Sequence, residues 1–138
     1  MKPEIVHLNY VDAVGGGILK ILSSKSASYC QFGELYFSEL DQGIFRGWKL
    51  HTKSDSFLFV IRGEASIHIV SSETTCETIN LTEVLTSQCA LWLPHGITFG
   101  FKSVGTESLI IANFASEEYS SNEVERPELN FHTCDWTL

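Results

Sequence analysis

Short segments in which apolar and polar residues alternate make up most of the chain. Alternation with a period of two is typical of β-strands that bury one face. Turn residues separate the segments, as at Asp41-Gln42-Gly43 and at Arg62-Gly63-Glu64. The predicted strands cover residues 33–40, 43–52, 56–71 (two strands), 77–82, 89–94, 97–105 and 108–115. This pattern predicts an all-β barrel or sandwich, and we expect an antiparallel jelly-roll β-barrel.

One segment departs from the strand pattern. Residues 120–128 (SSNEVERPE) are polar, and they are the one candidate for a short helical turn, which Pro127 would end. No repeat, low-complexity tract or linker interrupts the sequence. Because 138 residues are enough for one core, we predict a single domain over residues 1–138.

A cluster of basic residues stands out in an acidic chain. The sequence has 9 Lys and Arg against 17 Asp and Glu, a net charge of −8. That charge argues against nucleic acid as a partner, because phosphate backbones need a broad basic field. Arg46, Lys49, His51 and Lys53 nevertheless lie close together. The last three have the same parity, so a strand projects them from one face. This face is expected to line a cavity for a small anion, or else to face solvent.

Neither export nor membrane insertion is indicated. The first residues (MKPEIVHLNYVDAVGGG) lack the apolar core of a signal peptide, and apolar runs such as residues 109–115 are too short to cross a bilayer. We therefore expect a cytoplasmic protein without a membrane partner. The four cysteines are scattered and do not have the spacing of a zinc site.

Four motifs in a fixed order carry a resemblance to a known family. They are GIFRGWKLH (43–51), FLFVIRGEASIHIV (57–70), ALWLPHGITFGF (90–101) and NFASEEYSSNEVERPELNFHTCDW (113–136). Together they resemble the dTDP-4-dehydrorhamnose 3,5-epimerase-like (RmlC-like) cupins, which include the sugar 3,4-ketoisomerases. The resemblance implies a cupin barrel, commonly a homodimer. It also implies an isomerase or epimerase of a nucleotide-linked 4-keto-sugar, in the synthesis of deoxysugars for surface polysaccharide such as lipopolysaccharide.

The implied reaction sets requirements on the residues. A 4-keto group acidifies the hydrogens on C3 and C5, so the catalyst needs a base, positive charge near the ketone oxygen and an acid, with no metal or redox cofactor. Arginine and lysine are suited to hold the diphosphate. By the resemblance, the candidate catalytic residues are His51, Lys49, Tyr36 and Tyr119, and the candidate substrate-binding residues are Arg46, Lys53 and Asp55. We add His95, a loop residue expected at the rim of the barrel within reach of a ligand.

Two departures from the family pattern leave alternatives open. Lys49 stands where the family has its histidine base, and Phe99 replaces another histidine. Lys49 can serve as a base only if its pKa is strongly depressed; otherwise it is a cation that holds phosphate. The alternative function is a catalytically impaired sugar-nucleotide-binding cupin. A metal-dependent cupin dioxygenase is a weaker alternative, because only His51 remains of the usual metal ligands, and we expect no metal.

Overall fold

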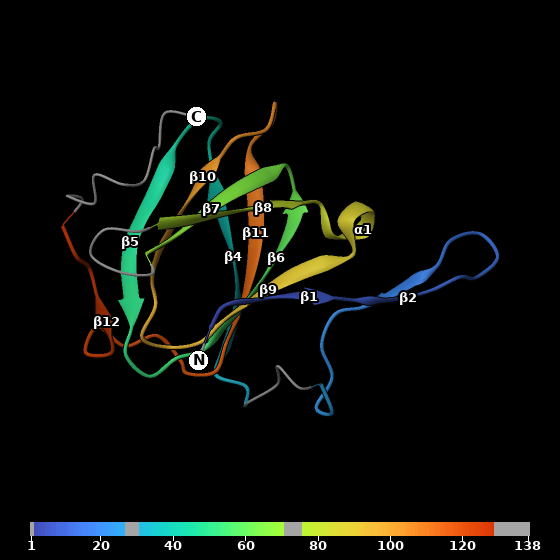
Figure 1. The fold of residues 1–138 in the computed structure, drawn as a ribbon. Coiled ribbons are helices and arrows are strands. Elements are labelled where there is room, and N and C mark those ends of the chain that lie inside the picture. The colour runs from blue at the N-terminus through green and yellow to red at the C-terminus, as the bar shows by residue number, and fades with distance from the viewer. Residues whose placement is uncertain (1, 27–30, 71–75, 129–138) are drawn as a thin grey trace.

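The computed structural model describes residues 2–26, 31–70 and 76–128, and two five-stranded sheets enclose its core (Figure 1). The first sheet has the strand order β1-β9-β6-β11-β4 and the second has the order β12-β5-β10-β7-β8. Strands β2 and β3 form a separate hairpin, which projects from the body of the molecule (Figure 1). The elements are β1 (Glu4–His7), β2 (Asn9–Val11), β3 (Ile18–Lys20), β4 (Glu34–Leu40), β5 (Phe45–His51), β6 (Ser56–Arg62), β7 (Glu64–Val70), β8 (Cys76–Thr82), α1 (Val84–Ser87), β9 (Cys89–Leu93), β10 (Thr98–Ser103), β11 (Leu109–Ala115) and β12 (Val124–Glu125).

Alternating side chains from the two sheets meet in one core. Val60 of β6, Ile67 and Ile69 of β7, and Leu109 and Ile111 of β11 are all at most 2% exposed. Each such side chain contributes about 1.5–3 kcal/mol through its removal from water. The paired strands are antiparallel, which confirms the predicted all-β, jelly-roll class.

The predicted strands, all from residue 33 onward, are present, but one local prediction differs from the structure. Residues 121–123 form a turn that leads into β12 rather than a helical turn. In β12, Val124 pairs with His51, so this polar segment satisfies its backbone at the open edge of β5. The described helix is instead α1, a single turn that ends at Gln88 with a φ of 56°. Within the described ranges, no helix is long and apolar enough to cross a membrane.

A bulge in β5 shapes the face that carries the basic cluster. Lys49 pairs with Phe99 and Arg46 pairs with Phe101, so an extra residue of β5 lies between the two pairs. Directly opposed residues share a face, so the bulge turns Arg46 toward the face that carries Lys49. The backbones are close here, because a Cβ on Gly47 would lie 2.8 Å from the Cα of Gly100. Glycine is therefore required at this point of the strand pair.

Candidate functional site

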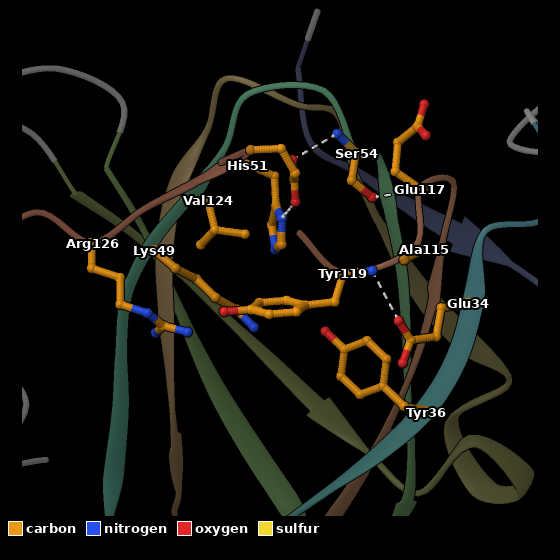
Figure 2. Close-up of a pocket in the computed structure, with 11 residues that line it drawn as sticks. Glu34, Tyr36, Lys49, His51, Ser54, Ala115, Glu117, Tyr119, Val124 and Arg126 are labelled. Carbon is orange, nitrogen blue, oxygen red and sulfur yellow. Dashed lines mark hydrogen bonds and ion pairs between the residues drawn. The ribbon is translucent and has the colours of Figure 1, made fainter. Parts of the chain in front are cut away.

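A pocket of about 260 Å³ opens where β4 of the first sheet approaches β5 and β12 of the second (Figure 2). Its wall combines inward-facing strand residues with the segment that follows β11. The lining residues are Glu34, Tyr36, Lys49, His51, Ser54, Ala115, Glu117, Tyr119, Glu123, Val124 and Arg126.

His51 and Glu123 form a buried pair at the top of the pocket. The Nδ1 atom of His51 lies 2.6 Å from Oε1 of Glu123, and their side chains are only 11% and 8% exposed. The other carboxylate oxygen accepts hydrogen bonds from the backbone N–H groups of Lys53 and Ser54, both at 3.2 Å. Burial raises the pKa of Glu123, but these hydrogen bonds and His51 outweigh it and hold the pKa below its usual value. Glu123 is therefore a fixed carboxylate that orients the imidazole.

The second nitrogen of His51 is left available. Nε2 is buried and has no hydrogen-bond partner within the part of the chain that the structure describes. When Nδ1–H donates to a carboxylate, Nε2 carries the lone pair that can accept a proton. The imidazole also stacks on Phe99, with ring centroids 6.3 Å apart and planes 29° apart. Position and orientation are thus fixed on both sides, which suits a general base.

Lys49 lies against the same aromatic ring. Its Nζ atom is 5.4 Å from the centroid of Phe99, an arrangement that favours the charged amine. Burial, together with the positive charges of Arg126 and Arg46, lowers the pKa of Lys49 to about 8. Lys49 is therefore mostly a cation at pH 7, held in a setting where its charge is costly.

This cost predicts a stabilising substitution. Lys49→Met should raise the free energy of unfolding by about 1–2 kcal/mol at pH 7, because it removes a desolvated cation beside two others. The gain should shrink above pH 8. The pKa of this lysine is 10.5 in the unfolded chain and about 8 in the folded chain, so between these values the unfolded chain binds more protons. The free energy of unfolding of the wild type therefore rises with pH in this range. Urea denaturation at pH 7 and pH 9 measures both effects. Lys53→Met, at an exposed lysine, is the control; a Lys49→Met protein less stable than the wild type at pH 7 contradicts the prediction.

Two tyrosines reach the pocket in different ways. The Tyr36 hydroxyl accepts a hydrogen bond of 2.8 Å from Nδ2 of Asn113. Burial, and then the negative charge of Glu34, raise the pKa of Tyr36, so its phenol stays protonated. Tyr119 is 63% exposed, and its backbone N–H donates to Glu34 at 3.0 Å. Figure 2 shows its ring extending across the pocket toward Lys49.

The structure therefore brings four of the predicted site residues together. Lys49, His51, Tyr36 and Tyr119 line one pocket, and their catalytic roles remain predictions. Of the predicted substrate-binding residues, none lines it. They are Arg46, which is exposed on β5; Lys53, exposed beyond the end of that strand; and Asp55 and His95, which form their own pair at 2.8 Å. The parity argument for Lys53 does not apply, because β5 ends at His51.

Several lining residues were not predicted, and Glu123 matters most among them. It is 72 positions from His51, and no spacing in the sequence links the two. Arg126 and Glu34 likewise reach the pocket only through the pairing of β12 with β5 and of β4 with β11.

In the described ranges, no group of three or more His, Cys, Asp or Glu side chains is placed to hold a metal ion. Metal independence remains a prediction.

Comparisons with known proteins agree on the fold. No protein-family model matches the chain, and no curated protein matches its sequence. A dTDP sugar isomerase from Desulfovibrio desulfuricans G20 is 23% identical, with a TM-score of 0.81 over 97% of this chain and 90% of that one. The sugar 3,4-ketoisomerase QdtA from Thermoanaerobacterium thermosaccharolyticum, in complex with TDP, is 15% identical, with a TM-score of 0.78 over 94% and 91%. The epimerase RmlC from Legionella pneumophila Philadelphia 1, in complex with dTDP-4-keto-L-rhamnose, is 17% identical, with a TM-score of 0.81 over 99% and 79%. These similarities confirm the predicted RmlC-like cupin fold.

Proposed function

We propose that this protein isomerises or epimerises a nucleotide-linked 4-keto-sugar by metal-independent proton transfer. The observation that carries the proposal is the His51–Glu123 pair, which leaves the buried Nε2 atom without a partner among the described residues, in the pocket that Lys49 also lines. The fold shared with dTDP-sugar isomerases and epimerases supports the choice of substrate class.

In the proposed reaction, Nε2 of His51 removes a proton from the carbon next to the ketone. The resulting imidazolium is stabilised by the carboxylate of Glu123, at 2.6 Å from Nδ1. The negative charge moves onto the ketone oxygen, where the ammonium group of Lys49 can stabilise it. Delivery of a proton to the same carbon by an acid on the other face gives an epimer. For an isomer, the hydrogen of the 3-hydroxyl passes to the oxygen on C4 and a proton is delivered to C4, which leaves the ketone at C3.

The role of Lys49 follows from its charge at neutral pH. A lysine with a pKa of about 8 is mainly protonated at pH 7, which suits a stabilising cation better than a base. His51 supplies the base instead, although Lys49 stands at the position of the family's histidine. The main argument for the impaired-cupin alternative is therefore weaker, since the pocket contains a histidine whose Nδ1 atom lies 2.6 Å from a carboxylate.

The nucleotide diphosphate requires positive charge near the pocket mouth. Arg126 lines the pocket, and both Arg126 and Arg46 are close enough to Lys49 to lower its pKa. We assign the diphosphate to these two arginines, whose planar groups suit phosphate oxygens. Lys53, Asp55 and His95 remain predicted substrate-binding residues at the rim.

The synthesis of deoxysugars for surface polysaccharide, including lipopolysaccharide, and a cytoplasmic location are part of the same proposal.

A homodimer is also part of this proposal. The outer face of the first sheet exposes large apolar side chains: Leu35 is 51% exposed and Phe37 is 63% exposed, opposite Phe114 and Ala112 of β11. Exposed apolar patches of this kind mark interfaces, and a two-fold axis lets one patch cover its own copy. We expect the wild-type protein to be a dimer by analytical ultracentrifugation. Phe37→Glu should make it monomeric, whereas Leu85→Glu, at an exposed apolar residue of α1, should leave the dimer intact. A monomeric wild-type protein contradicts this arrangement.

The proposed activity is tested with a dTDP- or UDP-linked 4-keto-6-deoxy-sugar as substrate. We expect nuclear magnetic resonance spectra to show conversion to a 3-keto isomer or to a C3 or C5 epimer without added metal and in the presence of a chelator. Calorimetric titration with TDP and UDP measures binding separately. Tight nucleotide binding without conversion contradicts the proposed activity and supports the impaired-cupin alternative.

A further inference from the structure

A buried asparagine behind the pocket has no evident structural function. Asn113 is 4% exposed and occupies the inward face of β11, between the apolar residues Ile111 and Ala115. Burial of an amide without full hydrogen bonding costs about 1–3 kcal/mol. An apolar side chain of similar size would fill this position without that cost.

Among the described residues, the side-chain hydrogen bonds of Asn113 do not form a stabilising network. A primary amide has two donor hydrogens and an acceptor oxygen. Nδ2 donates to the Tyr36 hydroxyl at 2.8 Å, while Oδ1 is buried and has no partner among the described residues. Among the described residues, the amide group of Asn113 therefore forms its side-chain hydrogen bond with the Tyr36 phenol.

The position of this contact links it to the pocket. Asn113 and Tyr36 are directly opposed in the pairing of β11 with β4, so the two strands fix their relative placement. Tyr36 lines the pocket, and Figure 2 shows its hydroxyl pointing toward the end of the Lys49 side chain. A phenol oxygen that accepts from Asn113 still has its own hydrogen to donate.

We propose that Asn113 is a positioning residue: by donating to the phenol oxygen, it directs the Tyr36 O–H into the pocket as a hydrogen-bond donor to a substrate oxygen. This inference rests on the proposed keto-sugar chemistry for the identity of that oxygen. The inference gives this donor role to Tyr36 and not to Tyr119, because Tyr36 is held in place by a buried partner while Tyr119 is mostly exposed.

A double-mutant cycle tests the inference by activity. Asn113→Asp has the shape of asparagine but only accepts, so it should draw the phenol hydrogen away from the pocket. We expect Asn113→Asp and Tyr36→Phe each to lower kcat/KM about 10- to 100-fold, and the double variant to be no worse than Tyr36→Phe. The matched control is Ser103→Ala. Ser103 lies outside the pocket, and its hydroxyl is another buried polar group without a described partner, so this variant should keep full activity. Losses that multiply in the double variant would overturn the inference.

A second measurement does not depend on turnover. In protein labelled with ¹³C at the tyrosine Cζ, the Tyr36 signal is identified by its loss in Tyr36→Phe, and its titration gives the pKa of the phenol. Removal of the donating amide in Asn113→Leu should raise the pKa of Tyr36, and Ser103→Ala should leave it unchanged. Asn113→Leu carries no charge, so it serves even if Asn113→Asp fails to fold. An unchanged pKa in Asn113→Leu refutes the inference, whereas a raised pKa in a protein without keto-sugar conversion supports the hydrogen bond and refutes only the proposed function.

Discussion

Replacement of His51 by glutamine is expected to lower kcat/KM for a nucleotide-linked 4-keto-sugar by about 10²- to 10⁴-fold, the usual contribution of a general base. The reason is geometric. The imidazole is held by Glu123 at 2.6 Å and by stacking on Phe99, and its Nε2 atom has no described partner. Glutamine can occupy the space and contact Glu123, but it cannot take up a proton at neutral pH. Steady-state kinetics of the purified variant measures the loss.

Two further variants make this result specific. Glu123→Gln keeps the shape of the side chain but removes the charge that selects the Nδ1–H form of His51, so we expect a loss of about 10²-fold or more. His7→Gln, at a histidine of β1 that does not line the pocket, should retain wild-type activity. A His51→Gln enzyme with near wild-type kcat/KM would show that another group removes the proton.

Replacement of Lys49 by methionine is expected to lower kcat/KM by about 10²- to 10³-fold, the cost of losing one group that stabilises a developing oxyanion. This loss accompanies the gain in stability predicted for the same variant, because the charge that destabilises the folded state is the one that the reaction uses. The coincidence of higher stability with lower activity would identify Lys49 as a residue retained for function.

The pH dependence gives a sharper test of the same side chain. Since the pKa of Lys49 is lowered to about 8, the ammonium form predominates at pH 7 and is lost as the pH rises through 8. We therefore expect kcat/KM to fall above pH 8 in the wild type. Lys49→Arg keeps its charge at these pH values, so its lower activity should not show that fall. An identical fall in the Lys49→Arg variant would assign it to another group, and a rise in activity above pH 8 would indicate that Lys49 acts as a base.

The fold was largely predictable because it depends on local patterns. Period-two alternation and turn residues mark the strands from residue 33 onward, and the order of the motifs indicates the barrel type. Residues 120–128 were predicted wrongly because their backbone pairing is non-local. Their polarity suits a turn or a helix end, whereas the deciding interaction is with β5, about seventy residues away in the chain.

The predicted residues that line the pocket came from two sources: the parity of one strand for Lys49 and His51, and the family resemblance for Tyr36 and Tyr119. The parity of Lys49 and His51 on β5 places both in the pocket, but the same parity fails for Lys53 once the strand has ended. Glu123 and Arg126 come from the segment whose structure was mispredicted, so neither was expected. Phe99 was interpreted only as the replacement of a family histidine, yet its ring lies against both Lys49 and His51. Such contacts depend on the register of β10 against β5, which could not be predicted from the sequence.

Hydrogen exchange at carbon tests most directly whether His51 removes a proton from the sugar. Wild-type protein is incubated in D₂O with dTDP-4-keto-6-deoxyglucose, and deuterium at C3, C4 and C5 is followed by nuclear magnetic resonance and mass spectrometry, with His51→Gln in parallel. We expect enzyme-dependent deuterium incorporation at one or more of these carbons, and its near-complete loss in His51→Gln. Saturating binding of the nucleotide sugar without incorporation at any of the three carbons would contradict the proposed proton transfer.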